Sequence, residues 1–543
     1  MNDDARPDAP AAKADEYRTD GTWGEQTITG LVADHALLHP GRPAATDQHR
    51  SLDYGGLWRR AREAAAGFTI DGVAAGERVL LHLPNSVAWL ECLLGLIEAG
   101  AVPVMSTESL RASELIEQAR AVGASHLLTP AEVTFSAMRE AAVEAVRNLD
   151  GALQLHEIPI ATGPRSAPGV DAQATSSCRA EDPALIQIGG PRCPDVLPVV
   201  RRHEDYLCSV ELSNAACALT ADAVMLIGIP ASHNYTMASP GIMGALLAGA
   251  HVVFAPDPTP STCWPLLAAH GCTHTPLVPS LLVPWLEAAG DDPAAVAGLR
   301  VIWVGGAPLD LTLAARVEAG LGVRVQEVYG MAEGLVAYSP LDMDRTSVAE
   351  HRLVPMSERD EIRIVDPSSG VDAVPDGEGR SRGELLCRGP YTVAGFLGAP
   401  EGACGIFDAD GWYHSGDIVE HQMPDAGFGK PRLAVLGSCK PQINRGAEKI
   451  FPGRVESVLL RHPQVVEAKL IGVDDEVLGH ATRAVVTVVP DETGRYPKTL
   501  KLRRFLHEAK LAAYYLPDSF EIHKRPADGE GALGATRRID KEV

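Results

Sequence analysis

The composition of residues 187–198 indicates whether this stretch could bind an anion such as phosphate. A predicted strand at 184–188 leads into Gly189 and Gly190, and glycines after a strand let backbone N–H groups approach a phosphate. The rest of the stretch is unsuited to that task, because its three prolines remove N–H donors and Asp195 adds a negative charge. It also lacks the lysine and hydroxyl groups that balance a phosphate's charge. The sequence therefore predicts an altered phosphate loop.

The same stretch carries a thiol. Cys193 could attack a thioester or an adenylate, and the neighbouring Arg192 could lower the pKa of that thiol. The alternative is that Cys193 is an inert small residue on a surface loop. Both interpretations stay open.

Short apolar strands alternate with helical patterns on either side of this stretch. Examples are the strand 79–83 with the helix 87–99, and the strands 224–229 and 301–304. This alternation predicts an α/β fold with a large N-terminal domain of two α/β layers. Short strands and turns from about residue 361 predict a small β-rich subdomain.

A third α/β pattern follows Gly437. We expect a disordered leader over 1–26, a large domain over 27–437 and a small α+β C-terminal domain over 438–543 that moves on a hinge.

Composition excludes several classes of function. The 543 residues carry a net charge of −23, which argues against nucleic-acid and anionic-membrane binding. No apolar run approaches the roughly 20 residues of a membrane span. The ten cysteines include no Cys-x-x-Cys pair, so neither a zinc site nor a disulfide framework is indicated and a cytoplasmic location is expected.

Four ordered motifs carry a resemblance to a known family. They are Ser-His-Asn-Tyr-Thr-Met-Ala-Ser-Pro-Gly at 232–241, Val-Tyr-Gly-Met-Ala-Glu-Gly at 328–334, His-Ser-Gly-Asp-Ile at 414–418 and Gln-Ile-Asn-Arg-Gly-Ala-Glu-Lys at 442–449. With these motifs the chain resembles the adenylate-forming superfamily of acyl-CoA synthetases, peptide-synthetase adenylation domains and luciferases. It is most similar to stand-alone aryl-acid ligases such as 2,3-dihydroxybenzoate–AMP ligase. The resemblance implies two domains that rotate between an adenylation pose and a thioester-forming pose.

The resemblance also implies roles for individual residues. Glu333 matches a Mg²⁺-binding glutamate and Asp417 a ribose-binding aspartate, while Lys449 matches a lysine near the thioester-forming site. The nucleotide side would comprise Gly305, Ala307, Tyr329, Gly330, Met331 and Asp417. The substrate side would comprise His233, Asn234, Tyr235, Ser239, Gly306 and Val336. Amide and hydroxyl groups there suit a hydroxylated aromatic ring. The alternative is that the cluster around His233 only caps a helix.

Three stretches depart from the family pattern. The phosphate loop, with Gly189, Gly190, Arg192 and Asp195, has none of the family's hydroxyls and lacks its lysine. At the hinge, Ser438, Lys440 and Pro441 stand where the family has an arginine, a lysine and an aspartate. Arg538 replaces the family's catalytic lysine, keeping the charge but not the ammonium geometry.

Three hypotheses follow, all within natural-product biosynthesis of the siderophore or peptide-synthetase type. The leading one is a repurposed enzyme that acts on an aryl or short acyl group, as the acid or as a carrier-protein or CoA thioester. Acyl transfer or condensation would then proceed without efficient ATP- and Mg²⁺-dependent adenylation, with Glu333, Lys449, Arg538 and Cys193 as candidate catalytic residues. The first alternative is an active aryl-acid AMP ligase that loads a carrier protein or CoA. The second is a non-catalytic partner of a biosynthetic assembly line.

Overall fold

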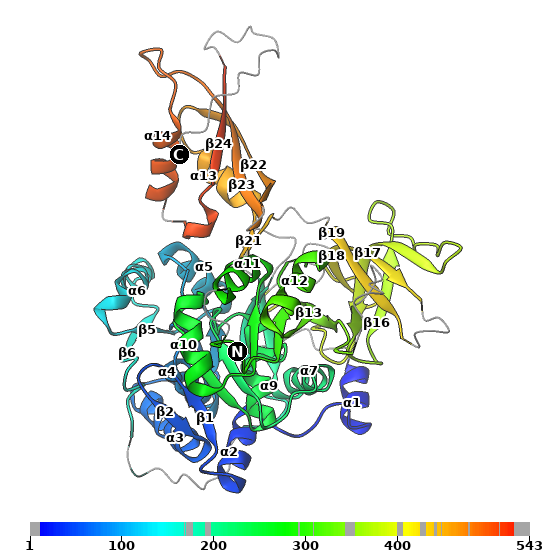
Figure 1. Ribbon diagram of the computed structural model, residues 1–543. Helices are drawn as coiled ribbons and strands as arrows, with labels where there is room; N and C mark the ends of the chain where they lie inside the picture. Colours follow the sequence, from blue (N-terminus) through cyan, green and yellow to red (C-terminus); the bar gives the residue numbers. More distant parts are fainter. Residues whose placement is uncertain are drawn as a thin grey trace.

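A computed structural model describes most of the chain in three parts (Figure 1). The described residues are 11–167, 169, 178–189, 197–290, 294–307, 309–342, 353–398, 406–423, 430–438, 443–446, 448–475, 478–509 and 511–525. Figure 1 shows a large N-terminal part, a small antiparallel sheet to one side of it, and a C-terminal part above it. Within the described ranges, no helix has the length and apolar character needed to cross a membrane. The predicted α/β fold, with a large N-terminal domain, a β-rich subdomain and a small C-terminal domain, is confirmed.

The first α/β layer is a six-stranded sheet. Its strands are β3 (Arg78–Leu81), β4 (Val102–Met105), β5 (His126–Pro130), β6 (Gln154–Ile158), β7 (Pro183–Gly189) and β8 (Leu197–Arg202). They lie in the order β6-β5-β3-β4-β7-β8. All neighbours pair in parallel except β7 and β8, which form an antiparallel pair at one edge. The predicted phosphate loop is the connection between these two strands.

The second layer is a nine-stranded sheet. Its strands are β1 (Pro43–Thr46), β2 (Ser51–Asp53), β9 (Val224–Ile227), β10 (His251–Phe254), β11 (His274–Leu277), β12 (Val301–Val304), β13 (Arg324–Met331), β14 (Gly334–Tyr338) and β15 (Val354–Pro355). The order is β15-β14-β13-β12-β11-β9-β10-β1-β2. Strands β10, β9, β11, β12 and β13 are parallel, so their carboxyl ends meet at one edge of the sheet.

Helices pack on both layers. They are α2 (Ile28–Leu38), α3 (Tyr54–Ile70), α4 (Val87–Glu98), α5 (Ala112–Val122), α6 (Ser136–Asn148), α7 (His203–Ala216), α8 (Asn234–Ala238), α9 (Gly241–Ala248), α10 (Pro260–His270), α11 (Pro279–Ala289) and α12 (Leu311–Leu321). Every residue of α4 is buried, as expected for a helix that is apolar on nearly all sides. Its core cluster includes Leu81 of the first layer and Met225 of the second. Helix α4 therefore contributes to a core that both sheets share.

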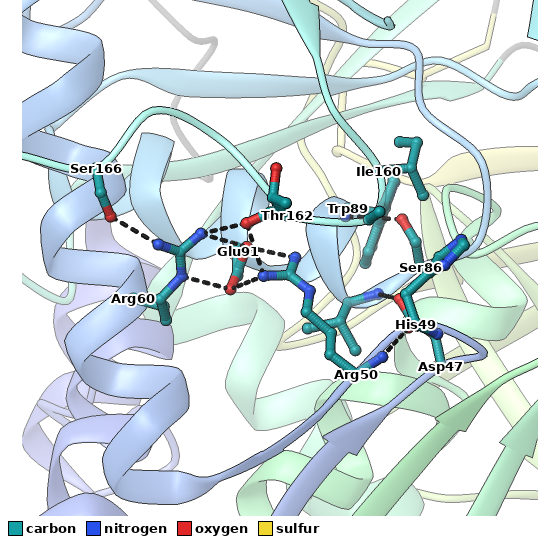
Figure 2. Close-up of polar contacts among 12 residues, drawn as sticks. Asp47, His49, Arg50, Arg60, Ser86, Trp89, Glu91, Ile160, Thr162 and Ser166 are labelled. Carbon is teal, nitrogen blue, oxygen red and sulfur yellow. Dashed lines mark hydrogen bonds and ion pairs between the residues drawn. The ribbon is translucent and has the colours of Figure 1, made fainter. Parts of the chain in front are cut away.

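A charged residue of α4, Glu91, is buried between two arginine side chains (Figure 2). Glu91 is fully buried and accepts hydrogen bonds from Arg50 at 2.7 and 2.9 Å and from Arg60 at 3.0 and 3.5 Å. Both guanidinium groups also donate to the carbonyl of Thr162, at 3.0 and 2.7 Å. This buried cluster ties the segment after β6 to α3, α4 and the β1–β2 hairpin.

The β-rich subdomain is a four-stranded antiparallel sheet. Its strands, in spatial order, are β16 (Glu361–Val365), β17 (Arg380–Arg388), β18 (Tyr413–Gln422) and β19 (Arg432–Ser438). Ser438 is the last residue of β19 and lies opposite Asp417. The sheet of the large domain thus extends one residue past the predicted boundary.

The N-terminal segment corrects one prediction. A helix, α1 (Ala11–Thr19), is present where a disordered leader was expected, and Tyr17 and Trp23 are buried. The Trp23 indole donates to the carbonyl of Pro390 at 2.8 Å, and Arg18 forms an ion pair with Glu204 at 2.7 Å. The prediction of disorder was wrong for residues 11–26, because a polar helix gains its stability from contacts with distant segments. Residues 1–10 lie outside the described ranges.

The C-terminal part has its own core. Its elements are β20 (Ile443–Arg445), β21 (Glu448–Ile450), α13 (Pro452–Leu459), β22 (Val465–Asp475), β23 (Gly479–Val488), α14 (Thr499–Glu508) and β24 (Ser519–Lys524). Strands β22, β23 and β24 form one sheet, and β20 and β21 form a hairpin.

The two domains touch through the first two turns of α5. Arg454 lies 2.7 Å from Glu117, and the amide of Ala512 donates to Glu114 at 3.0 Å. At the turn of the β20–β21 hairpin, a Cβ atom placed on Gly446 would lie 3.5 Å from the Ser280 hydroxyl of α11. The small domain is therefore docked with this hairpin against the large domain.

Candidate active site

The predicted site residues of the second layer lie at the carboxyl ends of parallel strands. Residues 232–239 follow β9, Gly305 follows β12, and Tyr329 lies near the carboxyl end of β13. Ligands of open α/β sheets bind in the crevice outside these strand ends. The topology therefore brings the three predicted segments to one edge.

Tyr235 packs closely on the glycine after β12. A Cβ atom at Gly305 would lie 3.2 Å from the Tyr235 ring and 3.0 Å from the carbonyl of Val328. The Tyr235 hydroxyl donates to the carbonyl of Leu277 at 3.2 Å, and burial raises the pKa of this phenol far above its usual range. A side chain at position 305 would push the ring away, so glycine is required for this contact.

His233 and Asn234 have different surroundings at the start of α8. His233 is exposed, and its Nδ1 accepts a hydrogen bond from the amide of Tyr235 at 3.2 Å, which caps the helix. Asn234 is half-buried, and its Oδ1 accepts from the Tyr206 hydroxyl at 3.2 Å. The capping role expected as the alternative is thus present for His233, whereas Asn234 is held by a different helix.

Two further members of the predicted substrate side, Ser239 and Val336, are buried, whereas Gly306 is exposed. Ser239 is 5% exposed and Val336 is 3% exposed. A Cβ atom at Gly330 would lie 3.1 Å from a methyl group of Val336, so this glycine lets β13 and β14 pair closely. Gly306 has a φ of +84°, a left-handed conformation that glycine adopts without strain.

The nucleotide side contains a half-buried tyrosine–carboxylate pair. The Tyr329 hydroxyl donates to Oδ2 of Asp417 at 2.8 Å. Burial, reinforced by the charge of Asp417, raises the pKa of Tyr329 far above its usual range, so the phenol stays a donor. The backbone amide of Asp417 donates to the Ser415 hydroxyl at 3.0 Å, and the neighbouring Gly416 amide donates to Glu384 at 3.1 Å. The carboxylate is therefore fixed between β13 and β18.

Glu333 lies in the turn between β13 and β14 and is 4% exposed. Its carbonyl accepts from the amide of Val393 at 2.8 Å. Its carboxylate occupies the space that a side chain at Gly189 would need. A glycine at this position therefore lets Glu333 approach the end of β7, where the predicted phosphate loop begins. A carboxylate at this point is suitable for holding Mg²⁺.

The structure adds three residues that the sequence did not single out. Arg201, 2% exposed, pairs with Asp205 at 2.8 Å and donates to the carbonyl of Ala332 at 3.0 Å. Its guanidinium carbon also lies 5.1 Å from the centre of the Tyr206 ring. An available sequence signal was the Arg–Asp spacing of four residues at the start of a predicted helix, with a tyrosine next to it.

Several predicted residues lie outside the described ranges. These are Gly190, Arg192, Cys193 and Asp195 of the loop, Lys440 and Pro441 of the hinge, and Arg538. Lys449 lies in β21 opposite Asn444. Ala307 is half-buried after Gly306, and Met331 ends β13 with 8% exposure.

The fold and the site together define an adenylate-forming enzyme fold. Two α/β layers and a β-rich subdomain form a large domain, and a small C-terminal domain docks near its strand ends. The resemblance assigns the nucleotide to Tyr329 and Asp417, the metal to Glu333 and the acyl group to the segment 232–239.

The chain belongs to the AMP-binding enzyme family. The model of the AMP-binding enzyme family matches residues 32–397, and that of the AMP-binding enzyme C-terminal domain matches residues 454–529. The chain is 38% identical to pyochelin synthase PchD of Pseudomonas aeruginosa, over 99% of this chain and 96% of that protein. It is 34% identical to the 2,3-dihydroxybenzoate-AMP ligase of Bacillus subtilis, over 96% and 95% of the two chains.

A third relative and a solved structure agree with these matches. The salicyl-AMP ligase / salicyl-S-ArCP synthetase of Mycobacterium tuberculosis is 36% identical, over 98% of this chain and 93% of that protein. The apo structure of MbtA from Mycobacterium smegmatis superposes with a TM-score of 0.71 and 34% identity, covering 94% of each chain. The resemblance to aryl-acid ligases is thereby confirmed.

Proposed function

We propose that this protein activates an aryl carboxylate with ATP and Mg²⁺ as an acyl adenylate and passes the acyl group to a thiol acceptor. The observation that carries the proposal is the assembly of Tyr329–Asp417, Glu333 and the Asn234–Tyr235 segment around one strand edge. Similarity over nearly the whole chain to proteins named as aryl-acid AMP ligases supports it.

Each group has a physical role in this reaction. Adenylation requires the carboxylate to be held next to the α-phosphate while negative charge on the phosphates is neutralised. Glu333 would hold the Mg²⁺ that supplies this neutralisation, and Asp417, oriented by Tyr329, would accept hydrogen bonds from ribose hydroxyls. Tyr235 would provide an apolar wall for the aromatic ring. The acceptor would be the phosphopantetheine thiol of a carrier protein or of CoA.

The position of the small domain is compatible with the second half of the proposed reaction, the transfer of the acyl group to a thiol. The turn of the β20–β21 hairpin lies against Ser280, and a Cβ atom at Gly306 would lie 3.6 Å from Val278, two residues before that serine. The hairpin that contains Lys449 therefore approaches the rim of the candidate site. This placement is the one expected of a thioester-forming pose.

A specific observation favours a second candidate function. Between Gly189 and Leu197 the chain has no serine, threonine or lysine, and Arg538 stands in place of the family's catalytic lysine. These differences favour an enzyme that acts on a preformed aryl or acyl thioester without adenylation. A non-catalytic partner of an assembly line is compatible with the same differences.

Exchange of radiolabelled pyrophosphate into ATP in the presence of aryl acids tests the first function. Aryl-acid-dependent exchange is the expected result, and its absence at high protein concentration would refute adenylation. A matched variant with R192S, C193T, P194G and D195T restores loop hydroxyls and a glycine. If only this variant exchanges pyrophosphate, the native loop has lost ATP use and the second candidate is favoured. Hydrolysis or transfer of an aryl thioester by the native protein would then identify that activity.

A further inference from the structure

The N-terminal strap, residues 11–23, comprises α1 and the turn that follows it. Figure 1 shows α1 beside α7 and the β-rich sheet. Arg18 forms a two-point ion pair with Glu204 of α7, at 2.7 and 2.9 Å. Lys13 pairs with Glu361 of β16 at 2.6 Å. The strap therefore bridges α7 and the β-rich subdomain.

The strap also contacts the segment that supports the turn of Glu333. Trp23 is 5% exposed, and its indole N–H donates to the carbonyl of Pro390 at 2.8 Å. Within the same short segment, the amide of Val393 donates to the carbonyl of Glu333 at 2.8 Å. Losing a buried hydrogen bond leaves its partner unsatisfied, so such bonds hold a segment in one position. Trp23 thus restrains the segment on which the backbone of Glu333 rests.

A second route joins the strap to the same segment. Arg359 pairs with Asp20 at 2.7 Å and with Glu16 at 3.3 Å. The next residue, Asp360, accepts a hydrogen bond from the hydroxyl of Tyr391. Tyr391 is 1% exposed and belongs to the segment that the strap contacts directly. The strap is therefore linked to this segment twice.

The α7 side of the strap leads to the other half of the same turn. Glu204, whose side chain is 2% exposed, lies in the first turn of α7. Arg201, near the end of β8, pairs with Asp205 of that turn at 2.8 Å and donates to the carbonyl of Ala332 at 3.0 Å. The carbonyls of Ala332 and Glu333 are thus held from two sides, and the strap is attached to both.

We propose that Trp23 is a positioning residue for the Glu333 carboxylate, so that the N-terminal strap sets the affinity of the nucleotide site for Mg²⁺. This inference rests on the Mg²⁺ role assigned to Glu333 under the proposed function, but not on adenylation. A misplaced carboxylate weakens Mg²⁺ binding, because this ion demands a near-ideal octahedral geometry. The strap ends before residue 32, where the match to the family model begins, so this support is additional to the segment that the model matches.

The test is calorimetric binding of α,β-methylene-ATP to the full chain, once with Mg²⁺ and once with EDTA. The ratio of the two affinities is the Mg²⁺-dependent gain. We expect Trp23→Phe to reduce this gain about five- to tenfold, and to leave the affinity in EDTA unchanged because that affinity does not involve the metal. The matched control is Trp264→Phe, since the indole N–H of this buried tryptophan has no hydrogen-bond partner among the described residues. An unchanged gain in Trp23→Phe would overturn the proposal.

A second variant carries the test if the tryptophan variant fails to fold. Arg359→Gln removes the ion pairs with Glu16 and Asp20, and the arginine side chain is 41% exposed, so the core is left intact. It should lower the Mg²⁺-dependent gain about twofold. The control is Arg363→Gln, which removes a pair with Asp372 at 2.7 Å and should leave the gain unchanged. Equal gains in Arg359→Gln and native protein would overturn the proposal.

A double-mutant cycle separates positioning from general loss of structure. In a Glu333→Gln background, Trp23→Phe should not reduce the remaining gain. A further reduction in that background would show that Trp23 acts independently of Glu333 and would refute the mechanism. If native protein binds the analogue equally with and without Mg²⁺, the metal role of Glu333 is wrong and this proposal falls with it. If the gain is present and falls as expected but pyrophosphate exchange is absent, only the adenylation step of the proposed function fails.

Discussion

Replacing Glu91 with glutamine should cost a large part of the stability of the large domain. Glu91 is fully buried, and the side chains of Arg50 and Arg60 are each 17% exposed. Glutamine removes the negative charge and turns an N–H group towards guanidinium donors. Arg50 then loses the carboxylate it pairs with, and Arg60 keeps only Glu63 at 3.4 Å. Breaking a buried pair in this way costs about 3–5 kcal/mol, against a total of about 5–15 kcal/mol for a typical domain.

Urea denaturation followed by tryptophan fluorescence measures this loss. All seven tryptophans lie at or before Trp412, so the signal reports the large domain alone. The control is Arg59→Gln, which removes a more exposed pair with Glu63 at 3.2 Å and should cost about 0.3–0.5 kcal/mol. A loss below about 1 kcal/mol for Glu91→Gln would refute the reasoning from burial and pairing.

Gly163 provides an independent check on the same cluster. It has a φ of +82°, and an added Cβ atom would collide with the Glu91 carboxylate and lie 2.7 Å from Arg50 and 2.8 Å from Arg60. Gly151 has a φ of +80° with nothing within 4 Å of the Cβ position. Gly151→Ala should therefore cost only the backbone strain of about 1–2 kcal/mol, whereas Gly163→Ala should cost more. Equal losses of stability in the two variants would show that the Arg50–Glu91–Arg60 cluster can shift without an energetic cost.

Three further predictions concern other parts of the chain. Tyr329→Phe removes the donor to Asp417 and should weaken binding of a non-hydrolysable ATP analogue about five- to tenfold by calorimetry; an unchanged Kd would contradict the assigned geometry. Arg454→Met removes the cation facing Glu117 at 2.7 Å and should speed hydrogen exchange at the docked surface of the small domain; unchanged exchange would show that this pair does not hold the domains together. Burial raises the pKa of Asp360 to about 7, so the folded protein keeps a proton that the unfolded chain releases above about pH 4. Stability should therefore fall as pH rises from about 4 to 7. Asp360→Asn should remove this part of the pH dependence in denaturation curves, and an unaltered pH profile would place the titration elsewhere.

The sequence by itself predicted the fold and supplied candidate residues for the nucleotide side. Strand and helix periodicity is local, and ordered motifs such as 328–334 and 414–418 carry their chemistry in residue type and spacing. That is why Tyr329, Glu333 and Asp417 were identified before their contacts were known. Composition alone also shows that residues 190–196 contain no serine, threonine or lysine, which is the basis for predicting an altered phosphate loop.

Only the tertiary structure decided which residues support these groups. Tyr206 meets Asn234, and Arg201 meets Ala332, across separations of 28 and 131 residues, and no local pattern encodes such pairings. The helix at 11–19 was missed for the same reason, since its polar sequence is stabilised by the contacts of Trp23 and Arg18 with distant segments.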